Sequence, residues 1–352
     1  MLSFLRENET VWEHIRRTDK PIALYGMGDG AEKIMRAMEK VGKKPDAVFA
    51  SDGFVRHNEF AGFTVQTLDE VEKEFGDVLV LLSFASERPE VLSLIERVAS
   101  RHELLAPDVP VVGDGLFDLD FLYKHEEEIQ IVYDQLADDR SRDTFAACIN
   151  YKISGKISYL LSCQTEKSHV WDELICPGWD ETFVDLGAYN GDTIREFLSH
   201  TDGQYQALAA FEPDVKNFRK LERTCGILPR TYLFNVGAYS HADTLTFAAR
   251  GGRHSTLSDH GKTVEVNSVD ALCADISPTI IKLDVEGAEF EALSGCRRTI
   301  ARLHPRLMVS AYHRNEDLFA LPLLIRELDP SYRLYLRHLP YLPCWETNYY
   351  AI

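Results

Sequence analysis

Four polar residues, Asp185, Glu212, Asp284 and His313, each stand at the end of a short run that favours a β-strand. In open α/β sheets, ligands bind outside the carboxyl ends of the strands, so residues placed there are candidates for ligand contact. A single polar residue at a strand end often only caps the following helix. Four in one sheet favour a shared site, and we predict one at this edge.

The loop that follows Asp185 has a pattern suited to ligand binding. Residues 182–186 are apolar and rich in β-formers, residues 187–191 are small, and residues 192–198 have helical spacing, which predicts strand, tight loop and helix. Such a loop brings backbone N–H groups and a helix N-terminus up to a ligand. Because Asp185 would repel a phosphate, we expect a ligand that is cationic or carries hydroxyl groups. Glu212, 25 residues after Gly187, stands at about the offset at which an acidic residue binds ribose hydroxyls.

Three ordered motifs, at residues 183–193 (FVDLGAYNGDT), 211–213 (FEP) and 281–289 (IKLDVEGAE), together resemble the FkbM family of S-adenosylmethionine-dependent methyltransferases. The resemblance covers about residues 180–352 and includes His313 and the region around Glu346. It implies a seven-stranded class I sheet and S-adenosylmethionine as cofactor.

The resemblance also implies cofactor contacts. Asp185 and the loop after it would hold the amino-acid end of the cofactor, Glu212 the ribose hydroxyls, and the strand end at Asn235 would lie beside the adenine. A strand-ending Asn is commonly only a turn residue, so that alternative stays open for Asn235. The expected cofactor-binding residues are Asp185, Gly187, Ala188, Tyr189, Asn190, Gly191, Asp192, Thr193, Glu212, Pro213, Asn235, Val236 and Gly237.

The expected catalytic residues are Asp284, His313, Glu286 and Glu289. Methyl transfer to oxygen needs an aligned acceptor whose proton is removed, and a carboxylate or an imidazole could accept that proton. The alternative for Glu286 and Glu289, three residues apart, is that they only cap a helix; a lone His is also more often structural. We predict no metal, because Asp284, Glu286 and His313 do not form a recognised ligand pattern.

The elements around these residues predict an α/β fold with two sheets. Alternating strands and helices at residues 1–113 indicate a smaller Rossmann-like α/β domain, in which residues 3–17 form the first helix. Residues 114–178 form a helical connector, with a helix over residues 116–136. Residues 179–352 form the methyltransferase-like domain, which ends in an antiparallel pair at residues 332–336 and 346–351. Residues 251–255 are expected to form a mobile flap, from which Ser255 could reach the cofactor.

The first domain carries a variant of the dinucleotide-binding fingerprint. Gly26, Gly28 and Ala31 would form the turn, and Asp52 would follow the second strand. The pattern is weak, and only about three strands are evident where a full dinucleotide site uses two mononucleotide halves. We therefore favour a degenerate module that binds another ligand, a partner or nothing.

Composition and charge argue against nucleic-acid-binding, membrane-spanning and secreted proteins. The net charge of −18, with no concentration of Lys and Arg evident in the sequence, argues against a nucleic-acid partner. No apolar run approaches the ~20 residues that span a bilayer, and no signal-peptide pattern is evident. The seven cysteines include no Cys-x-x-Cys pair, which favours a reducing cytoplasm.

The resemblance to the FkbM family implies an O-methyltransferase that acts on a hydroxyl of a small molecule. Because the first domain resembles nucleotide-sugar-handling domains found beside bacterial glycan enzymes, we expect a sugar or glycan as the acceptor, with a secondary metabolite as the other possibility. An NAD-dependent oxidoreductase that uses the first domain, and a non-catalytic S-adenosylmethionine-binding or assembly protein, stay open as alternatives. The sequence also leaves a homo-oligomer open.

Overall fold

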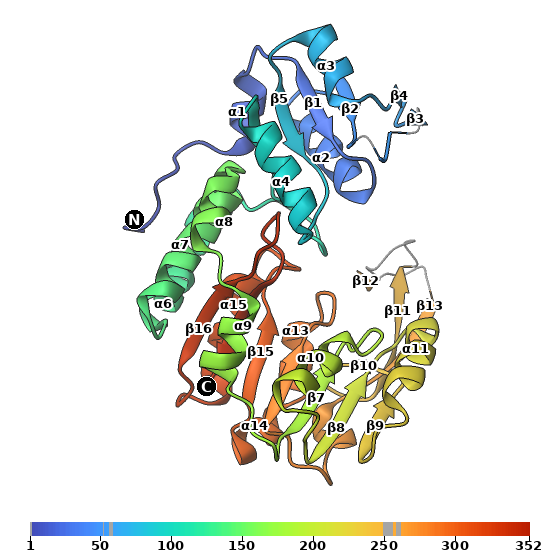
Figure 1. Cartoon of the computed structure of the whole chain (residues 1–352). Coiled ribbons are helices and arrows are strands. Elements are labelled where there is room, and N and C mark those ends of the chain that lie inside the picture. The colour runs from blue at the N-terminus through green and yellow to red at the C-terminus, as the bar shows by residue number, and fades with distance from the viewer. Residues whose placement is uncertain (1, 52, 56–58, 249–255, 258–261) are drawn as a thin grey trace.

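The computed structural model describes residues 2–51, 53–55, 59–248, 256–257 and 262–352. It contains a small parallel sheet near the N-terminus, a group of helices, and a seven-stranded sheet that ends the chain (Figure 1). Asp52 and residues 251–255, with the predicted flap and Ser255, lie outside the described residues. Within the described chain, no helix is both long enough and apolar enough to cross a bilayer.

The N-terminal sheet has the strand order β2-β1-β5-β6, and all its pairs are parallel. The strand β6 was not predicted from the sequence, because it is only three residues long. The first helix was also predicted to begin too early, because the chain enters α1 only after Thr10, whose side chain forms a capping box with Glu13. The elements are α1 (Val11–Arg17), β1 (Ile22–Tyr25), α2 (Asp29–Lys40), β2 (Ala47–Phe49), β3 (Glu59–Phe60), β4 (Phe63–Thr64), α3 (Leu68–Phe75), β5 (Leu79–Leu82), α4 (Pro89–Ala99) and β6 (Glu103–Leu105).

Helices follow the small sheet. The helix predicted over residues 116–136 is in fact two helices that meet at His125, where the first one ends and the second begins. Isolated bridges from Leu136 to Leu334 and from Gln164 to His338 attach this part of the chain to the edge of the large sheet. The elements are α5 (Leu119–Lys124), α6 (Glu126–Gln135), α7 (Asp139–Ser154), α8 (Ile157–Cys163), α9 (Lys167–His169) and the π-helix η1 (Val170–Ile175).

The large sheet has the order β16-β17-β15-β14-β7-β8-β9, and only β17 runs antiparallel to its neighbours. This confirms the predicted seven-stranded class I sheet and its closing antiparallel pair. Most of its strands are buried on both faces, as their apolar sequences require. The strands are β7 (Thr182–Leu186), β8 (Ala207–Phe211), β9 (Thr231–Phe234), β14 (Ile280–Leu283), β15 (Arg306–Ser310), β16 (Leu334–His338) and β17 (Thr347–Ala351).

Helices cover both faces of this sheet, and a separate small sheet lies beside the edge that β9 forms (Figure 1). Since β14 lies between β7 and β15 and all three are parallel, the residues that follow them gather at one edge. The helices are α10 (Asp192–His200), α11 (Val215–Cys225), α12 (Val269–Leu272), α13 (Glu289–Ser294), α14 (Arg297–Leu303) and α15 (Asp317–Leu328), and the small sheet contains β10 (Gly237–Ala238), β11 (Asp243–Ala248), β12 (Thr256–Leu257) and β13 (Lys262–Asn267).

Candidate active site

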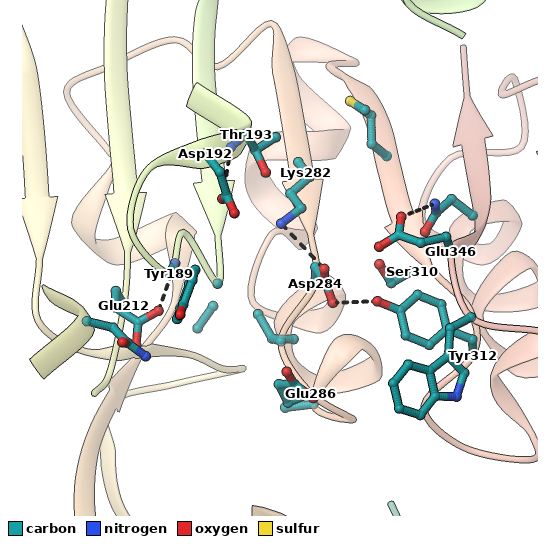
Figure 2. A pocket seen from close by; sticks show the side chains of 18 of the residues that line it. Tyr189, Asp192, Thr193, Glu212, Lys282, Asp284, Glu286, Ser310, Tyr312 and Glu346 are labelled. Carbon is teal, nitrogen blue, oxygen red and sulfur yellow. Dashed lines mark hydrogen bonds and ion pairs between the residues drawn. The ribbon is translucent and has the colours of Figure 1, made fainter. Parts of the chain in front are cut away.

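A cavity of about 1020 Å³ lies at the carboxyl ends of the central strands of the large sheet. One part is formed by the loops after β7 and β8, and the other by the ends of β14 and β15 and the loop between β16 and β17 (Figure 2). Of the residues predicted to bind a cofactor or to react, nine line this cavity: Gly187, Tyr189, Asp192, Thr193, Glu212, Pro213, Gly237, Asp284 and Glu286.

The loop after β7 packs directly on the backbone that follows β14. Gly187 has a φ of +82°, and a side chain there would collide with the carbonyl oxygen of Asp284. The N–H groups of Gly187 and Ala188 both donate to the carbonyl oxygen of Phe211, at 3.0 and 2.9 Å. Only glycine can occupy position 187 without displacing these neighbours. This contact brings the predicted cofactor loop and the predicted reacting edge into one cavity.

Glu212 directly follows β8 and has a carboxylate held by backbone groups. Its Oε2 accepts the N–H of Tyr189 at 2.9 Å, and its Oε1 accepts the N–H of Asp214 at 2.8 Å. Burial raises the pKa of Glu212 to about 7, although these two hydrogen bonds oppose the rise. A carboxylate oxygen can accept more than one hydrogen bond, so Glu212 can also accept from hydroxyl groups in the cavity.

Six residues predicted to bind a cofactor do not line the cavity: Asp185, Ala188, Asn190, Gly191, Asn235 and Val236. Asp185 is fully buried, and neither of its carboxylate oxygens accepts a hydrogen bond from the described residues. The side-chain amide of Asn235 donates to the carbonyl oxygens of Glu212 at 2.8 Å and Pro213 at 3.3 Å, as expected for the alternative role in a turn. Direct contact of these residues with a cofactor stays a prediction.

Lys282 lies between two carboxylates at the centre of the site. Its Nζ is 3.4 Å from Oδ1 of Asp185 and 3.6 Å from Oδ2 of Asp284. Burial disfavours the charged amine, but the two carboxylates outweigh it and raise the pKa of Lys282. Tyr312 donates its hydroxyl to Oδ1 of Asp284 at 3.3 Å (Figure 2). Lys282 and Tyr312 therefore hold the carboxylate of Asp284 from two sides, at the edge of the cavity.

His313 lies behind the cavity wall and is only 1% exposed. Its Nδ1 is 2.9 Å from Oε1 of Glu289, and its Nε2 is 3.5 Å from Oε2 of Glu286 and 3.6 Å from Oδ1 of Asp284. Burial opposes a charge on the ring, but the three carboxylates hold the pKa of His313 well above its ordinary value. A ring that already carries its proton cannot accept another, so the geometry favours the structural alternative; the predicted general-base role stays untested.

Glu289 is as buried as His313 and does not line the cavity. Its Oε1 accepts the N–H of Val285, in the turn before α13, at 2.8 Å and also faces His313; no side chain of the described residues caps the N-terminus of α13, so the capping alternative is not what Glu289 does. Ligand atoms of Asp284, Glu289 and His313 lie within 4.8 Å of one another, close enough to hold a metal ion. The prediction that no metal binds here stays untested.

An aromatic wall that the sequence did not predict is formed by Tyr312, after β15, and by Tyr341 and Trp345 in the loop between β16 and β17. Trp345 lies near-parallel to Tyr312 and Tyr341, at 18° and 26°, with ring centroids 6.5 and 6.1 Å away. All three line the cavity, together with Glu346. A signal was present, because β16 is parallel to β15, and the loop after β16 must therefore begin at the edge that holds His313.

Comparisons with known proteins agree with this architecture. Residues 185–342 match the family model described as Methyltransferase FkbM domain. The crystal structure of methyltransferase FkbM from Methylobacillus flagellatus KT aligns with a TM-score of 0.71 and 22% identity, covering 99% of this chain and 95% of that one. At 22% identity, this similarity shows a shared fold, and the shared fold includes both the N-terminal sheet and the large sheet. A search of curated proteins gives no match.

More distant structures share only part of the chain. Precorrin-6y C5,15-methyltransferase from Geobacter metallireducens GS-15 aligns with a TM-score of 0.33 and 12% identity, covering 53% of this chain and 90% of that one. A TM-score this low supports no further argument.

Proposed function

We propose that this chain, which carries an FkbM methyltransferase domain, transfers a methyl group from S-adenosylmethionine to a hydroxyl group of a sugar, a glycan or a sugar-like secondary metabolite. One observation carries the proposal. A single cavity joins a backbone-held carboxylate, Glu212, to a second carboxylate, Asp284, which lies between a buried lysine and a tyrosine hydroxyl.

The residues present fit S-adenosylmethionine. Gly187 and Gly237 leave the cavity wall without side chains, and Glu212 offers acceptors to a diol such as the ribose hydroxyls. Asp192 and Thr193, at the start of α10, would hold the amino-acid end. When bound, this cofactor supplies a methyl group on a positively charged sulfonium.

Asp284 is the group that we assign to the proton of the acceptor hydroxyl. It faces the cavity, and Lys282 and Tyr312 fix its position. An acceptor hydroxyl within hydrogen-bond reach of Asp284 would lose its proton to a carboxylate oxygen as the new C–O bond forms. His313 and Glu289, behind Asp284, would hold this wall in place.

The acceptor wall suits a neutral polyhydroxyl ring. Its aromatic surface, Tyr312, Tyr341 and Trp345, can pack against the apolar face of a sugar, and carboxylates can accept bonds from sugar hydroxyls. Of the four lysines that line the cavity, Lys167 is ion-paired with Glu196, Lys282 is ion-paired with Asp185 and Asp284, and Lys216 and Lys220 belong to α11, which follows the loop of Glu212. A phosphorylated or uronic acceptor would therefore meet repulsion.

The proposal is tested by transfer of labelled methyl groups from S-adenosylmethionine to a panel of methyl glycosides. We expect methylated glycoside together with S-adenosylhomocysteine, and weaker transfer to sugar phosphates. Asp284→Asn should reduce kcat by about 10²- to 10⁴-fold, whereas Asp275→Asn, a matched change at an exposed position, should not. Binding of the cofactor without any product across neutral glycosides would contradict the assignment of a sugar acceptor.

A further inference from the structure

We propose that the N-terminal domain is part of the acceptor site: the loop at residues 83–88 holds the aromatic wall in place, and Glu87 contacts the acceptor. This proposal rests on the proposed function for the identity of the acceptor. It gives the first domain a role that needs no ligand of its own.

Two backbone hydrogen bonds join the domains at the cavity. Ser86, four residues beyond the end of β5, donates its N–H to the carbonyl oxygen of Leu342 at 2.8 Å, and Leu342 donates its N–H to the carbonyl oxygen of Ser86 at 3.0 Å. Both residues are buried. Leu342 belongs to the loop at residues 339–346, which carries Tyr341, Trp345 and Glu346 and rises from the large sheet toward the first domain (Figure 1).

Glu87, the residue after Ser86, lines the cavity. Glu87 is an exposed residue of the N-terminal domain that borders the same cavity as Lys167 and Glu346. Lys167 is held by Glu196 at 2.7 Å. Burial opposes the charge of Lys167, but the negative charges of Glu196, Glu346 and Glu87 together raise its pKa. A hydroxyl-bearing acceptor that projects from the aromatic wall would meet Glu87 there.

A second junction supports the reacting edge. The N–H of Val112 donates to the carbonyl oxygen of His313 at 2.9 Å, and a side chain at Gly287 would come within 3.0 Å of Val112. Lys33 of α2 fixes this segment by donating to the carbonyl oxygens of Pro110 at 3.0 Å and Val111 at 2.9 Å. The chain that leaves the first sheet thus packs on the turn after Asp284.

The glycine turn of the first domain fits this role. A side chain at Gly26 would lie 2.6 Å from Phe84 Cδ1 and 2.9 Å from Ser83 Oγ, and one at Gly30 would collide with the carbonyl oxygen of Ser83. Tyr25 also packs edge-on against Phe84, with ring centroids 4.9 Å apart. The space that the glycines leave is filled by the start of the loop at residues 83–88, so the turn anchors the segment that reaches the acceptor site.

The first test measures whether the loop depends on the domain contact. Ser86→Pro removes one of the two backbone hydrogen bonds, whereas Ser86→Ala keeps both. In the full chain, hydrogen–deuterium exchange of residues 339–346 should become about fivefold faster or more in Ser86→Pro and stay unchanged in Ser86→Ala. A folded Ser86→Pro protein with wild-type exchange in residues 339–346 would overturn the proposal.

The second test measures acceptor recognition by Glu87. It tests the proposal even if Ser86→Pro does not fold. Glu87→Ala should raise KM for the methyl glycoside that is turned over best by about tenfold and leave the Kd of S-adenosylmethionine within about twofold. Glu96→Ala, an exposed residue of the adjoining helix α4, is the control. Equal KM values for the two variants would contradict a role for Glu87. If no glycoside is methylated, the proposed function fails, but the exchange test still decides whether the first domain holds the wall.

Discussion

The carbonyl oxygen of Asp284 occupies the space that a side chain at position 187 would need, so Gly187 and Asp284 are in direct backbone contact across the two halves of the site. Gly187→Ala should therefore weaken S-adenosylmethionine binding severely and lower the melting temperature. Gly203 has a similar φ of +71° but nothing within 4 Å of an added Cβ. Gly203→Ala should cost only the ~1–2 kcal/mol of left-handed backbone strain. Thermal unfolding and calorimetry of both variants test this; equal effects would show that the Gly187–Asp284 contact is unimportant.

We expect Glu212 to make the binding of S-adenosylmethionine depend on pH. Its ionised form is the one that accepts hydroxyl hydrogen bonds, and its pKa is raised to about 7 by burial. Affinity for S-adenosylmethionine should fall as the pH drops from 8 to 6. The Kd measured across this range should lose most of that dependence in Glu212→Gln; an unchanged pH profile in the variant would assign the titration to another group.

The same pKa predicts an effect on stability with the opposite direction. The folded-state pKa of Glu212 lies above its unfolded value of 4.5, so the folded protein binds the proton more tightly and loses stability as the pH rises from about 4.5 to about 7. Glu212→Gln removes this loss. The difference in free energy of unfolding, variant minus wild type, should therefore be more favourable at pH 8 than at pH 5. Urea titrations at the two pH values measure it, and a difference that does not depend on pH would be inconsistent with the raised pKa.

Lys282 holds two carboxylates that would otherwise repel each other. Lys282→Met leaves Asp185 buried beside Asp284 without its nearest cation. Breaking a buried ion pair in this way typically costs ~3–5 kcal/mol, and we expect a loss of that order in the free energy of unfolding. Lys216→Met, at an exposed position that also lines the cavity, provides the comparison. If both variants unfold at the wild-type urea concentration, Lys282 does not have the stabilising role described above.

Substitution of His313 distinguishes a structural role of this residue from a catalytic one. If its charged ring only holds Glu286, Glu289 and Asp284, then His313→Gln should lower stability and kcat without moving the acidic limb of the kcat profile against pH. If His313 were the general base, that limb would disappear. Initial rates from pH 5 to 9 in wild type and variant distinguish the two results.

The sequence predicted those parts of the site that depend on local pattern. The strand that contains Asp185, β7, is rich in β-forming residues, and Gly187 stands in a turn that only glycine fits, so strand, loop and helix could all be predicted. Parallel strand order then placed Glu212 and Asp284 at the same edge. The prediction that residues 116–136 form one helix was wrong because the break at His125 has no Gly or Pro to mark it.

Features that depend on tertiary packing could not be predicted from the sequence. Burial of Asp185 follows from its parallel pairing with Lys282 across β7 and β14, a register that no local pattern specifies. The contribution of Glu87 depends on the pairing of Ser86 with Leu342, 256 positions later in the chain, which only the folded structure reveals. The charged state of His313 likewise depends on carboxylates that the fold brings around it.

The central claim, that the cavity between Glu212 and Asp284 binds S-adenosylmethionine, is tested most directly by isothermal titration of the full chain with this cofactor at pH 8. We predict one site with a Kd in the micromolar range and a loss of about 100-fold in affinity in Glu212→Ala, which removes a charged hydrogen-bond acceptor. The absence of binding by the wild-type protein, or equal affinity in the variant, would contradict the account.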